Sequence, residues 1–147
     1  MSETIAQILK TKGDGIWSVP SDATVYDAIA MMADKAVGAL LVVEEGTLLG
    51  LISERDYARK VILQGRSSKD TRVREIMTRS LITVTPEDTV EACMRIMTQR
   101  RVRHLPVLQY SNLVGIVSIG DLVKAIISDQ AHTIDQLHTY ITNKYPV

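Results

Sequence analysis

The sequence predicts a mixed helix-and-strand protein of the α/β (α+β) class. Two pseudo-symmetric β-α-β-β-α repeats are expected to pack sheet to sheet, with a flanking helix at each end of the chain. Three observations predict this. Residues 18–61 align with residues 83–126 at a constant offset of 65 without a gap. In both copies a helical hydrophobic period gives way to continuous apolar runs in the same order. Both copies also carry G-x-x-S-x-x-D, at 50–56 and 115–121.

The identities between the two copies fall mostly at apolar and turn positions, which indicates a shared fold. The identical pairs are Val19/Val84, Thr24/Thr89, Val25/Val90, Met32/Met97, Val37/Val102, Leu40/Leu105, Val42/Val107, Leu48/Leu113, Gly50/Gly115, Ser53/Ser118 and Asp56/Asp121. Each repeat alone would leave one apolar sheet face uncovered. Packing one repeat against the other is the expected way to bury that face.

A helix is the first element with a clear period in each copy. Apolar residues recur at i, i+3, i+4 and i+7 in residues 24–36 and again in residues 89–101. The sequences S-D at 21–22 and P-E-D at 86–88 lie just upstream and contain residues that favour a helix start.

A continuous apolar run follows each helix, in residues 38–46 and 104–112, and each run ends in turn-forming residues. This pattern predicts a buried strand and a hairpin turn. The sequences LLGLIS and LVGIVS then predict a second short strand, which leads into helices at 54–63 and 119–128.

The segments outside the repeats are more polar. The segment from Gln64 to Ser80 is polar and basic at its start, which predicts a linker. In the tail, Ile134, Leu137 and Ile141 recur at helical spacing and predict an amphipathic helix that packs on the module or on a partner. The predicted division is an N-terminal segment or helix (1–15), repeat 1 (16–66), a linker (67–80), repeat 2 (81–128) and a C-terminal helix or tail (129–147).

Composition excludes several classes of protein. With 46% hydrophobic and 23% charged residues, the 147-residue chain resembles a globular domain rather than a disordered or fibrous one. No segment reaches the roughly 18 apolar residues of a membrane-spanning helix. The N-terminus lacks the pattern of a signal peptide, so a cytoplasmic location is predicted. The single cysteine, Cys93, excludes an internal disulfide and a multi-cysteine metal site, and we expect it in the core.

Basic residues are concentrated in the middle of the chain, although the formal net charge is zero. Between Arg55 and Arg103 lie twelve of the seventeen lysines and arginines, against six acids. This excess suggests a phosphorylated or polyanionic partner, whereas a solvated linker with exposed helix faces is the structural explanation. The alternative function is therefore nucleic-acid binding by the basic 55–103 region. It would act through Arg66, Lys69, Arg72, Arg74 and Arg79. It ranks lower because interleaved aromatic residues and known nucleic-acid motifs are missing.

The repeated G-x-x-S-x-x-D motif has a structural and a functional interpretation. Its serine stands where a strand ends and a helix begins, with an acid three residues later, which is the spacing of a capping box. A helix N-terminus also attracts anions, so a phosphorylated ligand can dock there. An aspartate turned outward can accept both hydroxyls of a ribose. On this second interpretation Gly50 and Gly115 let a ligand approach the strand.

These features together resemble a cystathionine-β-synthase (CBS) domain pair, also called a Bateman module. The resemblance rests on the tandem repeats, on RHLPV at 103–107 and on the paired GLISERD and GIVSIGD, and it covers about residues 16–128. It implies a module that binds adenine nucleotides in clefts between the repeats and regulates rather than catalyses. The family's ligands include AMP, ADP, ATP, S-adenosylmethionine and NAD(H). Such modules usually pair into a flat two-fold disc, so the resemblance also implies a homodimer.

The resemblance assigns residues to each cleft. Asp121 and Asp56 would hold ribose hydroxyls, with Ser118 and Ser53 near the ribose or phosphate. The Asp121 cleft would place the base near Ile16, Trp17, Ser18 and Val37 and the phosphate near Arg103 and His104. The Asp56 cleft would use Leu81, Ile82, Thr83 and Val102, with Arg55 facing the phosphate. Without the resemblance, Arg103 and His104 are expected to be a surface pair and Trp17 a core residue.

We expect the two clefts to differ. Arg103 and His104 align with Gly38 and Ala39, which carry no charge. Phosphate affinity depends on charge-assisted hydrogen bonds, for which arginine is the better donor. The Asp121 cleft is therefore expected to prefer AMP. The other cleft is expected to be empty, to take a weaker ligand, or to take a larger dinucleotide such as NAD(H).

The sequence contains no catalytic arrangement: no nucleophile with a base, no paired carboxylates, no P-loop and no G-x-G-x-x-G. His132 and His138 lie six residues apart in the tail, a spacing that is not typical of metal ligands. The prediction is a stand-alone regulatory module that senses adenine nucleotides, ATP included, and reports adenylate or redox state to a protein target. It is expected to have no enzymatic activity, no metal and no membrane partner.

Overall fold

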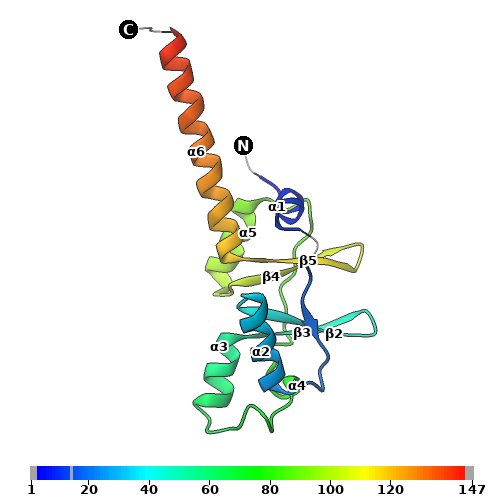
Figure 1. Ribbon diagram of the computed structural model, residues 1–147. Coiled ribbons are helices and arrows are strands. Elements are labelled where there is room, and N and C mark those ends of the chain that lie inside the picture. The colour runs from blue at the N-terminus through cyan, green and yellow to red at the C-terminus, as the bar shows by residue number, and fades with distance from the viewer. Residues whose placement is uncertain (1–2, 14, 145–147) are drawn as a thin grey trace. The chain divides into compact units, whose positions relative to one another are not determined.

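The computed structural model describes residues 3–13 and 15–144 and divides the chain into two compact units. One unit is formed by Gly15–Thr83, and the other combines the N-terminal helix with the chain from Val84 onward. Each unit contains helices and one small sheet, which confirms the α+β class (Figure 1). Within the described residues, no helix is long and apolar enough to cross a bilayer.

The unit Gly15–Thr83 has the predicted β-α-β-β-α order. Its elements are β1 (Ser18–Val19), α2 (Val25–Lys35), β2 (Ala39–Glu44), β3 (Thr47–Ser53), α3 (Glu54–Tyr57), the π-helical turn η1 (Ala58–Ile62) and α4 (Val73–Ile76). The sheet order is β1-β2-β3, with β1 parallel and β3 antiparallel to β2. The single helix predicted at 54–63 is thus a short α-helix continued by a π-helical turn.

The other unit contains α1 (Ile5–Lys12), α5 (Val90–Arg100), β4 (His104–Gln109), β5 (Asn112–Ser118) and α6 (Ile119–Lys144). Strands β4 and β5 form an antiparallel hairpin. The first strand predicted for this repeat is reduced to one parallel bridge between Val84 and Val107. The chain leaves the sheet after Val84 because the next amide, that of Thr85, donates to Asp88 Oδ2 at 2.7 Å and closes a turn.

Helices α2 and α5 begin and end at equivalent positions. Thr24 Oγ1 accepts from the amide of Asp27, and Thr89 Oγ1 accepts from that of Ala92, each at 3.1 Å. These threonines are the N-caps, so the start signals expected at 21–22 and 86–88 lie too early; those residues form the preceding turn. Both helices end on a left-handed residue, Ala36 at φ 55° and Arg101 at φ 56°.

Helix α6 is one continuous element of 26 residues, and it extends far from β5 in Figure 1. The sequence placed a boundary between the second repeat and the tail at residue 128, but the helix has no break there. Gly and Pro, which end helices, do not occur between Gly120 and Lys144. Ile134 and Leu137 of the predicted amphipathic tail are exposed. The last three residues of that tail, 145–147, lie outside the described residues.

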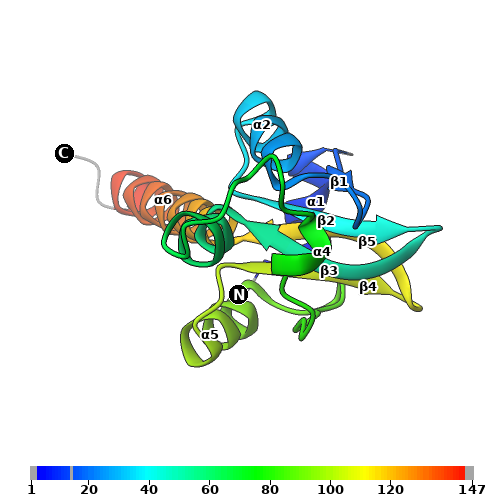
Figure 2. The ribbon, with the colours of Figure 1, turned by 90° about the horizontal axis from the view of Figure 1, so that it is seen from below.

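The segment that precedes each repeat packs on the other repeat. We call these two, the N-terminal segment and the linker, the exchanged segments. In the linker, the amides of Val73 and Arg74 donate to the carbonyls of Ala23 (2.8 Å) and Ser21 (2.9 Å). In the N-terminal segment, the amides of Ile5 and Ala6 donate to Asp88 and Pro86, both at 2.9 Å. Asp88 and Pro86 are the counterparts of Ala23 and Ser21 in the 65-residue register. Helix α1 therefore docks on the second repeat and α4 on the first; Figure 2 shows α4 against β3.

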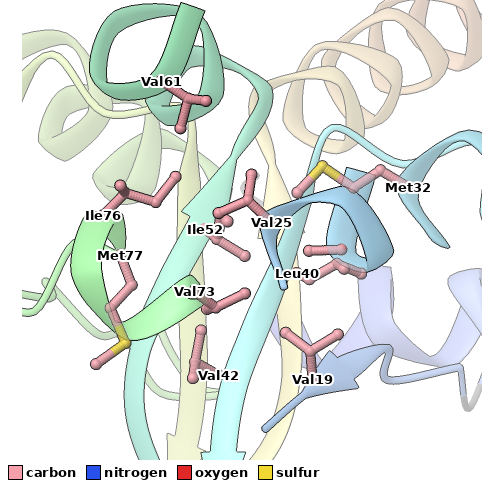
Figure 3. Packing of buried hydrophobic residues seen from close by; sticks show 11 residues of the cluster. Val19, Val25, Met32, Leu40, Val42, Ile52, Val61, Val73, Ile76 and Met77 are labelled. Carbon is pink, nitrogen blue, oxygen red and sulfur yellow. The ribbon is translucent and has the colours of Figure 1, made fainter. Parts of the chain in front are cut away.

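The core of the unit Gly15–Thr83 joins α2, the sheet and α4. Figure 3 shows Val25 and Met32 of α2 close to Leu40 of β2 and Ile52 of β3, with Val73 of α4 alongside. All five are buried. Burial of one such side chain stabilises the fold by roughly 1.5–3 kcal/mol. The i, i+3, i+4, i+7 face predicted for this helix is thus the one toward the core, with Ile29 at i+4 partly buried.

The equivalent face of α5 is buried through Val90, Cys93 and Met97. Cys93 is fully buried, as expected for a core cysteine. Burial, with a smaller contribution from Asp88, raises the pKa of the Cys93 thiol to about 11. This thiol therefore stays protonated at neutral pH, which makes it a poor nucleophile.

Candidate ligand sites at Asp121 and Asp56

Asp121 closes a capping box at the start of α6. Its Oδ2 accepts from the backbone amide of Ser118 at 2.8 Å, and its own amide donates to Ser118 Oγ at 3.2 Å. The structural interpretation of the motif is therefore confirmed. The aspartate side chain keeps 22% of its surface exposed. Within the described residues, no donor contacts the second oxygen, Oδ1, which leaves an acceptor at this position.

Lys12 at the end of α1 is the second partner of Asp121. Its Nζ lies 2.9 Å from Asp121 Oδ2 and donates to the carbonyl of Ile116 at the same distance. Sequence analysis missed this residue. Lys12 precedes the segment covered by the 65-residue register, so no repeat signal could assign it to a site 109 residues away.

The basic residues predicted for the phosphate lie in the same unit as Asp121. His104 is the register partner of Ser118 across the β4–β5 hairpin. The carbonyl of Arg103 accepts from the amide of Ile119 at 2.9 Å, which ties Arg103 to the first residue of α6. His104 is half-buried and Arg103 exposed, so only Arg103 fits the expectation of a surface residue.

Charges around this site shift two pKa values. Burial acts to raise the pKa of Asp121, but the Lys12 ammonium and the Ser118 donors together outweigh it, and the pKa lies below its ordinary value. Burial is the main cause that lowers the pKa of His104, and Lys12 and Arg103 add to it while Asp121 opposes it. At neutral pH Asp121 is therefore a carboxylate and His104 a neutral imidazole.

Asp56, the counterpart of Asp121, is more fully occupied by its own unit. Its Oδ2 accepts from the amide and hydroxyl of Ser53, at 3.0 and 3.1 Å. Its Oδ1 accepts from Thr78 Oγ1 at 3.3 Å and lies 3.1 Å from Lys60 Nζ. The side chain is 11% exposed. Both oxygens have protein partners, so the outward orientation expected for ribose binding is not found here. Arg55 is exposed one residue earlier.

The glycines of the repeated motif make room for protein rather than for a ligand. A Cβ at Gly50 would lie 2.7 Å from the carbonyl oxygen of Thr78, and one at Gly115 would lie 2.7 Å from Leu9 Cδ2. These contacts come from the two exchanged segments. The expectation that Gly50 and Gly115 let a ligand approach the strand is therefore wrong.

The remaining predicted residues are divided between the units. Ile16, Trp17, Ser18 and Val37, expected at the base of the Asp121 ligand, belong to Gly15–Thr83, as do Leu81, Ile82 and Thr83; Val102 belongs to the other unit. Trp17 is 41% exposed, with Lys35 Nζ 4.4 Å from its ring centroid, so it is no core residue. The ligand contacts of all these residues stay predictions.

The basic region makes local contacts that account for much of its charge. Arg66 pairs with Glu75, and Arg72 donates to the carbonyl of Asp22. Arg79 donates to the carbonyl of Arg74. Lys69 lies over the ring of Tyr26. The contacts of Arg66, Arg72 and Lys69 help to fix the linker on the first repeat, whereas the structural explanation expected a solvated linker. Among the described residues, no group of acidic, histidine or cysteine side chains could hold a metal ion.

The contribution of the Lys12–Asp121 pair to stability should disappear in acid. Because the folded-state pKa of Asp121 is lowered, the stabilisation is present above the unfolded pKa of about 3.8 and is lost as pH falls through the folded value. At pH 6 we expect Lys12→Met to lower the free energy of unfolding by about 1 kcal/mol, as for a partly exposed pair.

Urea denaturation of both proteins between pH 6 and pH 3 measures this difference. It should shrink toward the acid end as Asp121 is protonated and leave only the part contributed by the hydrogen bond to Ile116. Lys10→Met removes the same charge from the same helix and is the control, since no ion pair of Lys10 occurs among the described residues. A pH-independent difference for Lys12→Met would contradict the prediction.

Comparison with known proteins agrees with the repeat architecture. The model of the CBS domain family matches residues 5–62 and 73–128. The CBS domain-containing protein CBSX3, mitochondrial, of Arabidopsis thaliana is 47% identical over an alignment of 153 residues, which covers 98% of this chain and 74% of that protein. Its name places that relative in mitochondria, so the cytoplasmic location expected here stays a prediction.

Two solved structures extend the comparison. A candidate signal-transduction protein with CBS domains from Burkholderia ambifaria MC40-6 is 53% identical, with a TM-score of 0.84 over 87% of this chain and 96% of that one. The CBS domain pair of protein MJ0100, solved with 5′-methylthioadenosine and S-adenosyl-L-methionine, is 25% identical, with a TM-score of 0.75 over 84% of this chain and 99% of that one.

Proposed function

The chain belongs to the CBS domain family, and from this premise we propose that it is a regulatory module that binds AMP at the Asp121 site. ATP, ADP and NAD(H) are the alternative ligands. Binding would signal the energy or redox state of the cell to a partner protein. The module acts as a homodimer and without turnover of its ligand.

The observation that carries this proposal is the state of the Asp121 carboxylate. Oδ2 is held by Ser118 and Lys12, which fixes the orientation of the group. Oδ1 can accept a ribose hydroxyl, since no donor among the described residues contacts it. A carboxylate held in place by other donors loses little freedom when it binds, and preorganisation of this kind favours affinity.

The polar and charged side chains near Asp121 support a phosphorylated ligand. His104 is the first residue of β4 and Arg103 directly precedes it, beside the start of α6. The dipole at the start of α6 adds to the attraction of a phosphate. The guanidinium of Arg103 is exposed and can form two parallel hydrogen bonds to phosphate oxygens.

The adenosine part of the ligand rests on the family. The pair of protein MJ0100 was solved with two adenosine compounds. For this chain, the family resemblance assigns the base to Ile16, Trp17, Ser18 and Val37. Stacking on a base requires an exposed ring, and Trp17 is exposed.

Asp56 is expected to be the weaker site. Thr78 and Lys60 already occupy its Oδ1, so a ribose would have to displace them. The aligned residues Gly38 and Ala39 offer no cation for a phosphate. AMP is therefore expected to bind mainly at one site in each chain, that of Asp121.

A thermal-shift titration tests the proposal. A ligand at one hundred times its dissociation constant stabilises the folded state by about 2.7 kcal/mol, which for a chain of this size is a rise in Tm of roughly 5–10 °C. We expect AMP to raise the Tm with its concentration and GMP, which has the same ribose phosphate, to raise it far less. An unchanged Tm with AMP, ATP and NADH would rule out the proposed function. Sustained ATP or AMP hydrolysis that depends on Asp121 would contradict the absence of turnover.

A further inference from the structure

Among the described residues assigned to the Asp121 site, Lys12 alone comes from outside the repeats. It is the last residue of α1, and its ammonium is shared between Asp121 Oδ2 and the carbonyl of Ile116. The ammonium of a lysine has a further N–H beyond these two contacts. With 32% of its side chain exposed, Lys12 can direct that N–H toward a ligand held by the same carboxylate.

The charge of Lys12 changes what the site attracts. Alone, the Asp121 carboxylate would repel a phosphate and attract a cation. Lys12 at 2.9 Å cancels the charge of Asp121, so the pair carries no net charge. The charge of Arg103, which acts on the neighbouring His104, then leaves an excess of positive charge near the pair. His104 is the other titratable group near the pair, and because burial lowers its pKa it adds no positive charge at neutral pH.

We propose that Lys12 is a specificity-determining residue of the Asp121 site, and that it selects a phosphorylated adenosine over an adenosine compound that lacks a phosphate. This inference rests on the proposed function, because it requires that an adenosine ligand binds at Asp121. It names the ligand class more narrowly: an anion such as AMP, rather than a neutral thioether such as 5′-methylthioadenosine.

The two compounds make a direct test because they share adenine and ribose and differ at the 5′ position. Calorimetric titration gives the dissociation constants of AMP and 5′-methylthioadenosine for the wild type and for Lys12→Met. We expect the preference for AMP over 5′-methylthioadenosine to fall about tenfold in Lys12→Met, as for loss of one charge-assisted contact in a partly exposed site. The affinity for 5′-methylthioadenosine should stay the same or rise.

Two further variants separate charge from structure. Lys10→Met loses the same charge from the last turn of the same helix, and its preference should equal that of the wild type. Lys12→Arg keeps the charge and should restore most of the preference. Equal weakening of both ligands in Lys12→Met would mean that Lys12 only supports the fold, and it would overturn the inference.

The test also distinguishes this inference from the proposed function. A wild type that binds both compounds, with a preference that Lys12→Met leaves unchanged, would overturn the role of Lys12 alone. A wild type that binds neither compound nor any adenine nucleotide would overturn the proposed function and the role of Lys12 with it.

Discussion

Gly50→Ala is expected to lower the free energy of unfolding by about 3 kcal/mol, the upper end for overpacking of a well-packed site. A Cβ at this position would lie 2.7 Å from the carbonyl oxygen of Thr78 and 3.0 Å from Met77 Sδ. The Thr78 backbone cannot retreat easily because it exchanges two hydrogen bonds with Leu51, at 2.8 and 3.0 Å. The new methyl group would therefore force α4 and its following residues away from β3.

Gly115→Ala is the matched comparison in the other unit. There the nearest atom is Leu9 Cδ2, again at 2.7 Å, but it is the end of a flexible side chain. A change of rotamer relieves the clash, so we expect a loss below about 1 kcal/mol. Urea denaturation of both variants measures the difference. Equal losses, or a larger loss for Gly115→Ala, would show that the exchanged segments do not pack on the two strands as described.

Asp121→Asn is expected to weaken AMP binding at least tenfold. The substitution keeps an oxygen that can accept the Ser118 amide, so the helix cap survives. It removes the charge that strengthens a hydrogen bond from a ribose hydroxyl, and hydrogen bonds to charged groups contribute about 1.5–3 kcal/mol. Calorimetric titration with AMP measures the effect.

Asp56→Asn is the control for that measurement, because it makes the same change in the matching capping box. We expect it to leave AMP affinity within about twofold of the wild type, since Asp56 is already bonded to Thr78 and lies next to Lys60. If Asp56→Asn lowers the affinity for AMP as much as Asp121→Asn does, the assignment of one dominant site is wrong.

The local pattern of the sequence predicted most elements of both repeats, although the first strand of the second repeat is only a single bridge. Helical spacing from Val25 and from Val90 matches α2 and α5, and the apolar runs match β2 and β4. The serine and aspartate spacing predicted both capping boxes. These features depend on neighbours within a few residues, which is why sequence alone identifies them.

Features that depend on distant parts of the chain were missed. The linker was expected to be a connection, yet α4 is bonded to the turn that precedes α2. The N-terminal helix was expected only as a flanking element, and nothing in its sequence connects Lys12 with Asp121 or Leu9 with Gly115. The two aspartates have identical motifs, but their second oxygens differ because Thr78 and Lys60 reach only Asp56. Tertiary contacts of this kind leave no periodic signal.

A crystal structure of the protein grown with AMP tests the proposed Asp121 site most directly. We predict that a ribose hydroxyl lies within hydrogen-bond distance of Asp121 Oδ1 while Lys12 remains on Oδ2, with the phosphate close to Arg103 or His104. AMP bound at Asp56 alone, or crystals without AMP at millimolar concentration, would contradict the proposal.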